Sequence, residues 1–238
     1  HVPKINDFVN GLKILTSENG VITIEFPHLM ELVDHNQWDT IYHEHFSYFS
    51  FFVMQKILEK NRLKIFDVEK IATHGGSLRV FCTHSENKKI EIKDSVNNLL
   101  KLEREKGMME IPYYQNFSKK VIGSINQFTD FCNQMKKEGK IIVGYGAPAK
   151  ANTLLNCCGV NQDIIEYVVD LSPHKQGLYL PGSHIHIKSP EEIKKLKPDF
   201  VIIFPWNLKE EIMKQIQFIR NWGGKFVIPI PKLQIIDK

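Results

Sequence analysis

The sequence has no apolar run that approaches the roughly 20 residues needed to cross a membrane. It begins His1-Val2-Pro3-Lys4, which is not a secretory leader, and it has no initiator methionine. We therefore expect a soluble, cytoplasmic protein whose natural chain begins upstream of His1.

Cysteine is scarce and poorly placed for cross-linking. The four cysteines include no Cys-x-x-Cys pair, and two of them are adjacent on an expected helix, where they cannot easily bridge to each other. We expect Cys82, Cys132, Cys157 and Cys158 to be reduced thiols that are mostly buried, as is usual in the cytoplasm.

Charge of one sign is also lacking. The 31 basic and 27 acidic residues are interspersed and leave a formal net charge of only +4. This balance gives little support for nucleic-acid binding and is compatible with a mild attraction to small anions. With 42% hydrophobic residues over 238 positions, the chain has the composition of a globular protein with room for two domains.

Helix and strand patterns alternate in residues 1–85. Apolar residues recur with helical spacing from Ile5 to Leu15, and Asn19-Gly20 then turns the chain into a strand over 21–26 that Pro27 ends. The further expected elements are helices over 29–35 and 51–61 and strands over 63–70 and 77–82. This alternation predicts part of an α/β sheet.

The pattern changes after residue 85 and returns after residue 139. Residues 86–139 are polar, with apolar positions from Phe117 to Met135 that suit one long amphipathic helix, so we expect a helical connector there. From Lys140 on, the expected elements are strands over 141–143, 164–169, 199–204 and 225–230 and helices over 149–157 and 207–220. Such alternation predicts a parallel sheet with right-handed crossovers, hence a small Rossmann-like domain over 140–238.

The densest group of reactive side chains is Tyr42-His43-Glu44-His45, followed by Ser47 and Tyr48, in a stretch without a sustained helical or strand pattern. Imidazole has an ordinary pKa of about 6.5 and a carboxylate can orient it, so the group suits acid–base chemistry. A polar surface loop is the plain alternative. A zinc site is a third reading, but neither a His-Glu-x-x-His spacing nor a matching cysteine pair is present.

Two glycine-containing segments follow. In Thr73-His74-Gly75-Gly76-Ser77-Leu78-Arg79, the glycines permit close approach of a ligand, and Ser77 and Arg79 can bind hydroxyls or phosphate; the alternative is a tight hairpin turn with an exposed histidine. In Gly144-Tyr145-Gly146-Ala147-Pro148-Ala149-Lys150, a glycine turn opens a helix and leaves backbone N–H groups where a phosphate could bind. Asp170 ends the next strand, where dinucleotide folds place an acidic ribose ligand. A turn without a ligand is again the alternative.

These segments, in this order, resemble the sugar C-methyltransferases, which act on nucleotide-linked deoxy-keto-hexoses. The matching segments are Tyr42-His43-Glu44-His45-Phe46-Ser47-Tyr48-Phe49, His74-Gly75-Gly76-Ser77-Leu78-Arg79-Val80 and Gly144-Tyr145-Gly146-Ala147-Pro148-Ala149-Lys150-Ala151-Asn152-Thr153. The likeness extends over nearly the whole chain, including the segment that begins at Asp170 and the pair Pro181-Gly182. The features specific to the family are the tetrad Tyr42-His43-Glu44-His45 and the glycine turn that begins at Gly144, when both occur together.

The resemblance implies a domain organisation. Members have a small N-terminal zinc domain, a Rossmann-type methyl-donor domain and a C-terminal Rossmann-like domain that helps to hold the sugar nucleotide. Residues 1–85 would be the C-terminal half of the Rossmann-type methyltransferase domain, 86–139 the connector and 140–238 the sugar-nucleotide domain. The chain departs from the family because it has no cysteine-rich zinc segment and no glycine-rich first loop for S-adenosylmethionine. Its donor site is therefore expected to be incomplete.

The resemblance also implies a reaction: transfer of a methyl group from S-adenosylmethionine to the carbon beside the ketone of a nucleoside-diphosphate keto-sugar, without a metal. His45 would be the base, Glu44 would orient the imidazole or stabilise the enol, and Tyr42 would hydrogen-bond the ketone oxygen. The implied substrate-binding residues are His43, Ser77, Arg79, Gly144, Tyr145, Gly146, Lys150, Asn152 and Asp170.

Two other classes stay open. One is a non-catalytic sugar-nucleotide-binding fragment. The other is a nicotinamide oxidoreductase using Gly144–Ala149 and Asp170, although no hydride-transfer site accompanies those residues. The oligomeric state is not indicated by the sequence.

Overall fold

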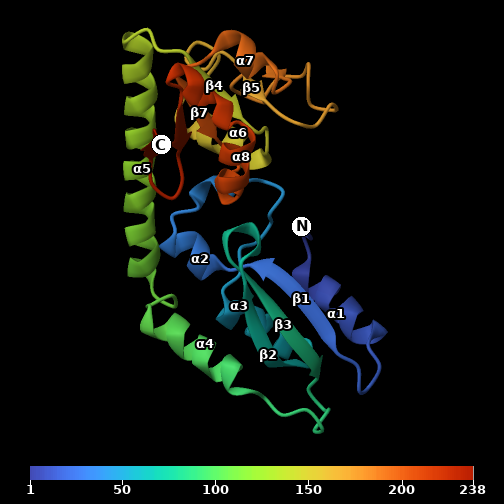
Figure 1. Cartoon of the computed structure of the whole chain (residues 1–238). Helices are drawn as coiled ribbons and strands as arrows, with labels where there is room; N and C mark the ends of the chain where they lie inside the picture. The colour runs from blue at the N-terminus through green and yellow to red at the C-terminus, as the bar shows by residue number, and fades with distance from the viewer. Residues whose placement is uncertain (238) are drawn as a thin grey trace. The chain divides into compact units, whose positions relative to one another are not determined.

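The computed structural model describes residues 1–237 and divides into two compact units, shown in Figure 1. The first unit comprises His1–Gln37 and His43–Ser118, and the second comprises Trp38–Tyr42 and the chain from Lys119 onwards. Each unit has its own sheet, so the predicted α/β class is confirmed.

The first unit is built on a three-stranded sheet in the order β1-β3-β2, in which the central strand runs antiparallel to both neighbours. Its elements are α1 (Ile5–Leu15), β1 (Ile22–Pro27), α2 (Leu29–Asp34), α3 (Phe51–Lys60), β2 (Leu63–Ile71), the 3₁₀ turn η2 (Thr73–Gly75), β3 (Ser77–His84) and α4 (Asp94–Glu105). The core joins buried residues of the strands to those of three helices, Val9 of α1, Met54 and Leu58 of α3, and Val96 and Leu99 of α4.

The segment expected to form a helical connector holds two helices, which are shared between the units. The first, α4, packs its buried face into the core of the first unit, while α5 (Ile111–Lys137) begins in the first unit and continues into the second. In the second unit α5 buries Phe128, Phe131 and Cys132, and the Phe131 ring meets the Phe200 ring edge-on at 5.4 Å between centroids. The boundary between the two units therefore lies within α5, between Ser118 and Lys119.

The second unit has a six-stranded sheet in the order β6-β5-β4-β7-β8-β9. The first five strands are parallel, as predicted, and only β9 is antiparallel. Its elements are η1 (Trp38–Thr40), β4 (Ile142–Tyr145), α6 (Ala149–Cys157), β5 (Val168–Val169), β6 (Ile187–Lys188), α7 (Glu192–Leu196), β7 (Phe200–Ile203), η3 (Trp206–Leu208), α8 (Lys209–Gln215), η4 (Gln217–Trp222), β8 (Lys225–Ile228) and β9 (Gln234–Ile236). Strands β4 and β7 are buried at every position, which is typical of a parallel sheet covered on both faces.

Two elements of the second unit differ most from their predicted bounds. The strand expected over 164–169 is confined to β5, because Ile164 and Ile165 donate their N–H groups to the Asn161 carbonyl in a turn. The helix expected over 207–220 is broken at Ile216, where φ is −112° and ψ is 27°, into α8 and the 3₁₀ segment η4. No periodic pattern predicted β6, α7 or β9.

The cysteines have the burial that the sequence predicts. All four cysteines are free, and three of them are buried while Cys157 is exposed, which confirms the prediction of mostly buried thiols. Burial raises the pKa of Cys82 to about 12. Within residues 1–237, no helix is both long enough and apolar enough to span a membrane.

Candidate active site

The glycine turn after β4 is shaped by the packing of neighbouring strands. A β-carbon on Gly144 would lie 2.4 Å from the Phe204 ring and 2.8 Å from Val168, so only glycine fits in this strand. Gly146 has a φ of +87°, and a β-carbon there would lie 2.5 Å from Pro205. The two glycines thus allow β4 to pass close to the end of β7 and to turn into α6.

The amides of this turn correct one expectation. Gly146 donates its N–H to the Val169 carbonyl at 2.7 Å, and Ala147 donates to Asp170 Oδ2, also at 2.7 Å. Pro148 follows and has no N–H group. The expectation that the turn leaves its N–H groups for a phosphate is therefore wrong for these residues, because the sheet and Asp170 already use them.

Asp170 is engaged inside the fold on both carboxylate oxygens. Besides Ala147, it accepts a hydrogen bond from the Ser172 amide at 2.8 Å, and the Lys175 ammonium lies 3.4 Å from Oδ2. Lys175 also donates to the Ala147 carbonyl at 3.0 Å. In this structure Asp170 ties the glycine turn to the loop after β5, which is the arrangement of a turn-stabilising residue; its predicted contact with a ribose stays a prediction.

Lys150 lies in the first turn of α6 and is held by residues of η3. Its Nζ donates to Asn207 Oδ1 at 2.8 Å and lies 4.3 Å from the centroid of the Trp206 ring. Burial lowers the pKa of Lys150, and the negative charge of Asp39 opposes that shift. A cation over an indole face is attracted by the negative face of the ring, so Trp206 stabilises the Lys150 charge.

Asp39 belongs to the 3₁₀ turn η1, which lies against α6. Its side chain is 1% exposed, and Oδ2 accepts a hydrogen bond from Trp206 Nε1 at 2.8 Å, while Oδ1 is buried without a hydrogen-bond partner. Burial raises the pKa of Asp39 to about 6, against the opposing effects of the Trp206 hydrogen bond and the Lys150 charge. Sequence reasoning missed this residue and Trp206. The available signal was an aspartate three residues before Tyr42 and a tryptophan just beyond a buried parallel strand, at the strand end where sites of α/β sheets gather.

The tetrad lies in a loop, as predicted, because no helix or strand covers residues 41–48. His43 and Glu44 are exposed, whereas Tyr42 and His45 are half-buried. The ring of His45 meets the Tyr48 ring edge-on at 5.5 Å and the His1 ring at 4.9 Å. Aromatic contacts of this kind restrict the orientation of an imidazole without occupying all its surface.

The far end of this loop is fixed by the start of α3. Ser50 caps the helix by accepting the Val53 amide at 3.2 Å, and the carboxylate of Glu103 accepts the Phe51 and Phe52 amides at 2.6 and 2.9 Å. Glu103 also pairs with His28 Nε2 at 2.7 Å, with both side chains fully buried. An anion at a helix N-terminus satisfies otherwise unpaired N–H groups, so Glu103 holds the residues that follow the tetrad.

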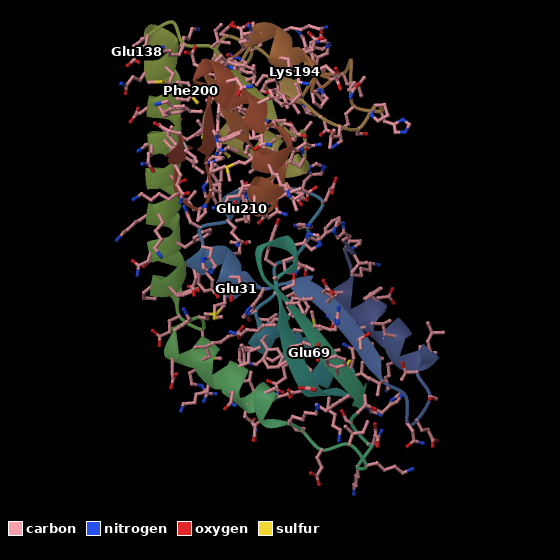
Figure 2. All side chains as sticks on the ribbon, in the orientation of Figure 1. Glu31, Glu69, Glu138, Lys194, Phe200 and Glu210 are labelled. Atoms are coloured by element: carbon pink, nitrogen blue, oxygen red, sulfur yellow. The ribbon has the colours of Figure 1, made fainter. Side chains whose placement is uncertain are left out.

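The segment Thr73–Arg79 forms the turn of the β2–β3 hairpin and the first residues of β3, and His74 is exposed. This is the tight hairpin turn with an exposed histidine that the alternative interpretation predicted. Ser77 is 2% exposed and donates to the Thr73 carbonyl at 3.0 Å. Gly76 has a φ of +120°, and a β-carbon there would lie 2.7 Å from the side chain of Glu31, which Figure 2 labels on α2. The space that this glycine leaves open is thus occupied by the side chain of Glu31 and not by a ligand.

Three further residues predicted to bind substrate, Arg79, Tyr145 and Asn152, have different surroundings. Arg79 forms an ion pair with Glu25 at 3.2 Å across β1 and β3. Tyr145 is 3% exposed and donates its hydroxyl to Gln215 at 2.7 Å, and burial raises its pKa. Asn152, on α6, has a buried Oδ1 without a hydrogen-bond partner, so it retains an acceptor. Their predicted substrate contacts stay predictions.

In residues 1–237, no three His, Cys, Asp or Glu side chains gather as a group that could hold a metal ion.

Residues 72–231 match the family described as the C-methyltransferase C-terminal domain. Over all 238 residues the chain is 36% identical to the C-methyltransferase NovU of Streptomyces niveus, and it spans 56% of the length of that relative. The tetrad lies outside the span of the family match but within the span of the NovU alignment. On these matches, the chain belongs to the C-methyltransferase family and contains its C-terminal domain.

Proposed function

We propose that this chain supplies the catalytic and sugar-binding residues for transfer of a methyl group to the carbon beside the ketone of a nucleoside-diphosphate keto-deoxy-sugar. The observation that carries the proposal is the Tyr42–His45 loop, which presents two histidines and a carboxylate outside regular structure in a chain of the C-methyltransferase family. Loops held by a rigid scaffold are the usual place for catalytic groups.

The proton step is assigned to the tetrad. His45 removes the proton from the carbon beside the ketone, because a histidine base has a pKa near working pH and its ring is oriented by Tyr48. Glu44 orients the imidazole, and the Tyr42 hydroxyl donates to the ketone oxygen as negative charge develops there. The resulting enolate carbon is the nucleophile for methyl transfer.

S-adenosylmethionine, the donor that the family implies, would supply the methyl group as an electrophilic carbon. The described residues do not fit it as a complete site, because two amides of the glycine turn of β4 are bonded to Val169 and Asp170, and the glycine turn after β2 is closed by the side chain of Glu31. We therefore assign no residue of this chain to the donor.

The nucleotide diphosphate is assigned to the start of α6. Lys150 contributes a positive charge in the first turn of that helix, whose N-terminal dipole also favours an anion. The Oδ1 atom of Asn152 is buried without a hydrogen-bond partner, so it can accept a hydrogen bond from a substrate hydroxyl. A binding role without turnover is the second candidate, and it is favoured because the amides of the glycine turn of β4 are already bonded within the fold and leave the donor unassigned.

The test is His45→Ala in the complete enzyme, measured as methyl transfer to the keto-sugar. Loss of a general base lowers the rate by roughly 10²–10⁴-fold, so we expect a loss in that range with ligand binding retained. His35→Ala is the matched control, because His35 is an exposed histidine of the same unit whose side chain pairs with Glu31 on α2. Wild-type turnover in His45→Ala would overturn the assignment.

A further inference from the structure

Trp206 lies between opposite charges within the second unit. The Asp39 carboxylate accepts from its indole N–H at 2.8 Å, and the Lys150 ammonium lies over its ring face at 4.3 Å. An indole has a positive edge and a negative face, so both contacts are favourable and each reinforces the other through the ring. We name Asp39, Trp206, Lys150 and Asn207 the Asp39 cluster.

The Asp39 cluster fixes a very short element. The turn η1 has three residues and ends at Thr40, two positions before Tyr42. A single 3₁₀ turn has little stability of its own, so its side chains must hold it in place. Trp38 donates to Ser124 on α5 at 3.3 Å, and Asp39 binds Trp206, so neighbouring residues of η1 are tied to two different helical segments.

The charge of Asp39 is not what a purely structural contact requires. A neutral asparagine could accept the same indole hydrogen bond at a lower desolvation cost, and Oδ1 of the aspartate lies buried with no partner. What a carboxylate adds is a stronger hydrogen bond and an attraction for Lys150 on α6.

We propose that Asp39 is a positioning residue for the Tyr42–His45 loop, acting through its charged contacts with Trp206 and Lys150 to fix the turn that leads into the loop. The proposal rests on the proposed function in one respect, that this loop is catalytic. Lys150 of α6 is the charged group that faces Asp39, and η3 presents to it the neutral indole of Trp206.

The contact itself is tested on this chain without any activity assay. The indole N–H signal of Trp206 is followed by NMR as a function of pH and is assigned among the three tryptophans with Trp206→Phe. We expect a transition near pH 6 as Asp39 titrates. The transition should vanish in Asp39→Asn and persist in Asp130→Asn, which alters an exposed carboxyl on α5. A pH-independent Trp206 signal in the wild type would overturn the proposal.

The positioning role is tested by steady-state kinetics in the complete enzyme. A hydrogen bond to a charged acceptor is stronger than one to a neutral acceptor by roughly fivefold in an equilibrium, so Asp39→Asn, which keeps an acceptor, should lower kcat by about fivefold while the KM for the sugar nucleotide changes little. Asp39→Ala removes the acceptor as well and should lose more activity, which makes the asparagine a partial rescue. Wild-type kcat in Asp39→Asn would show that the charge has no positioning role.

Failure of this proposal is distinguishable from failure of the proposed function. If His45→Ala keeps full activity while the Trp206 signal titrates, then the loop is not catalytic and the contact between Asp39 and Trp206 stands. If His45→Ala is inactive and Asp39→Asn has the wild-type kcat, the function stands and the positioning role is wrong.

Discussion

The buried carboxylate of Asp39 should make the free energy of unfolding fall as the pH rises. Burial raises its pKa from an ordinary 3.8 to about 6. A group with a raised pKa in the folded state contributes stability that is fully present below its unfolded pKa and is lost as the pH rises through its folded pKa. A difference of about two pKa units corresponds to about 3 kcal/mol. The loss attributable to Asp39 should therefore occur between about pH 4 and pH 6 and approach about 3 kcal/mol.

The substitution that isolates this contribution is Asp39→Asn, because an amide of the same shape cannot titrate. The difference in the free energy of unfolding between the variant and the wild type should shift by about 3 kcal/mol in favour of the variant between about pH 4 and pH 7. This shift is expected whatever the difference in free energy of unfolding at low pH. Urea unfolding followed by circular dichroism at a series of pH values measures this difference, and Asp130→Asn, at an exposed carboxyl, should follow the wild-type curve. Parallel curves for Asp39→Asn and the wild type would refute the reasoning.

Three further outcomes are expected. Calorimetry of this chain with S-adenosylmethionine should show weak binding or none, because the amides of Gly146 and Ala147 in its glycine turn are already bonded within the fold; micromolar binding would place a donor site here. Lys150→Ala should weaken binding of a nucleoside-diphosphate sugar at low salt and leave binding of the free nucleoside nearly unchanged, since the ammonium acts on the diphosphate; equal effects on both ligands would contradict this. Gly144→Ala should destabilise the fold by at least about 2 kcal/mol because its β-carbon meets Phe204 at 2.4 Å, as chemical denaturation would show. Gly123→Ala, on an open face of α5, should instead stabilise it by up to about 1 kcal/mol.

Local patterns were sufficient for the regular elements. The helices over Ile5–Leu15 and Ala149–Cys157 have the predicted bounds, because apolar spacing defines the first and a glycine-proline turn precedes the second. The parallel order of β4, β5, β7 and β8 also follows from alternation of strands and helices. Elements of two residues, such as β6, have no periodicity to detect and depend on pairing with β5.

The candidate site divides in the same way. The tetrad and the glycine turn are contiguous, so the sequence by itself determined where the reactive groups and the helix start lie in the chain. Only the tertiary structure decided that Asp170 and the sheet occupy the amides of Gly146 and Ala147, and that Ser77 and Arg79 bond within their own hairpin and sheet. It also decided that Asp39 meets Trp206, 167 residues further along the chain, because a hydrogen bond between buried side chains requires the two segments to be brought together by packing that no local pattern encodes.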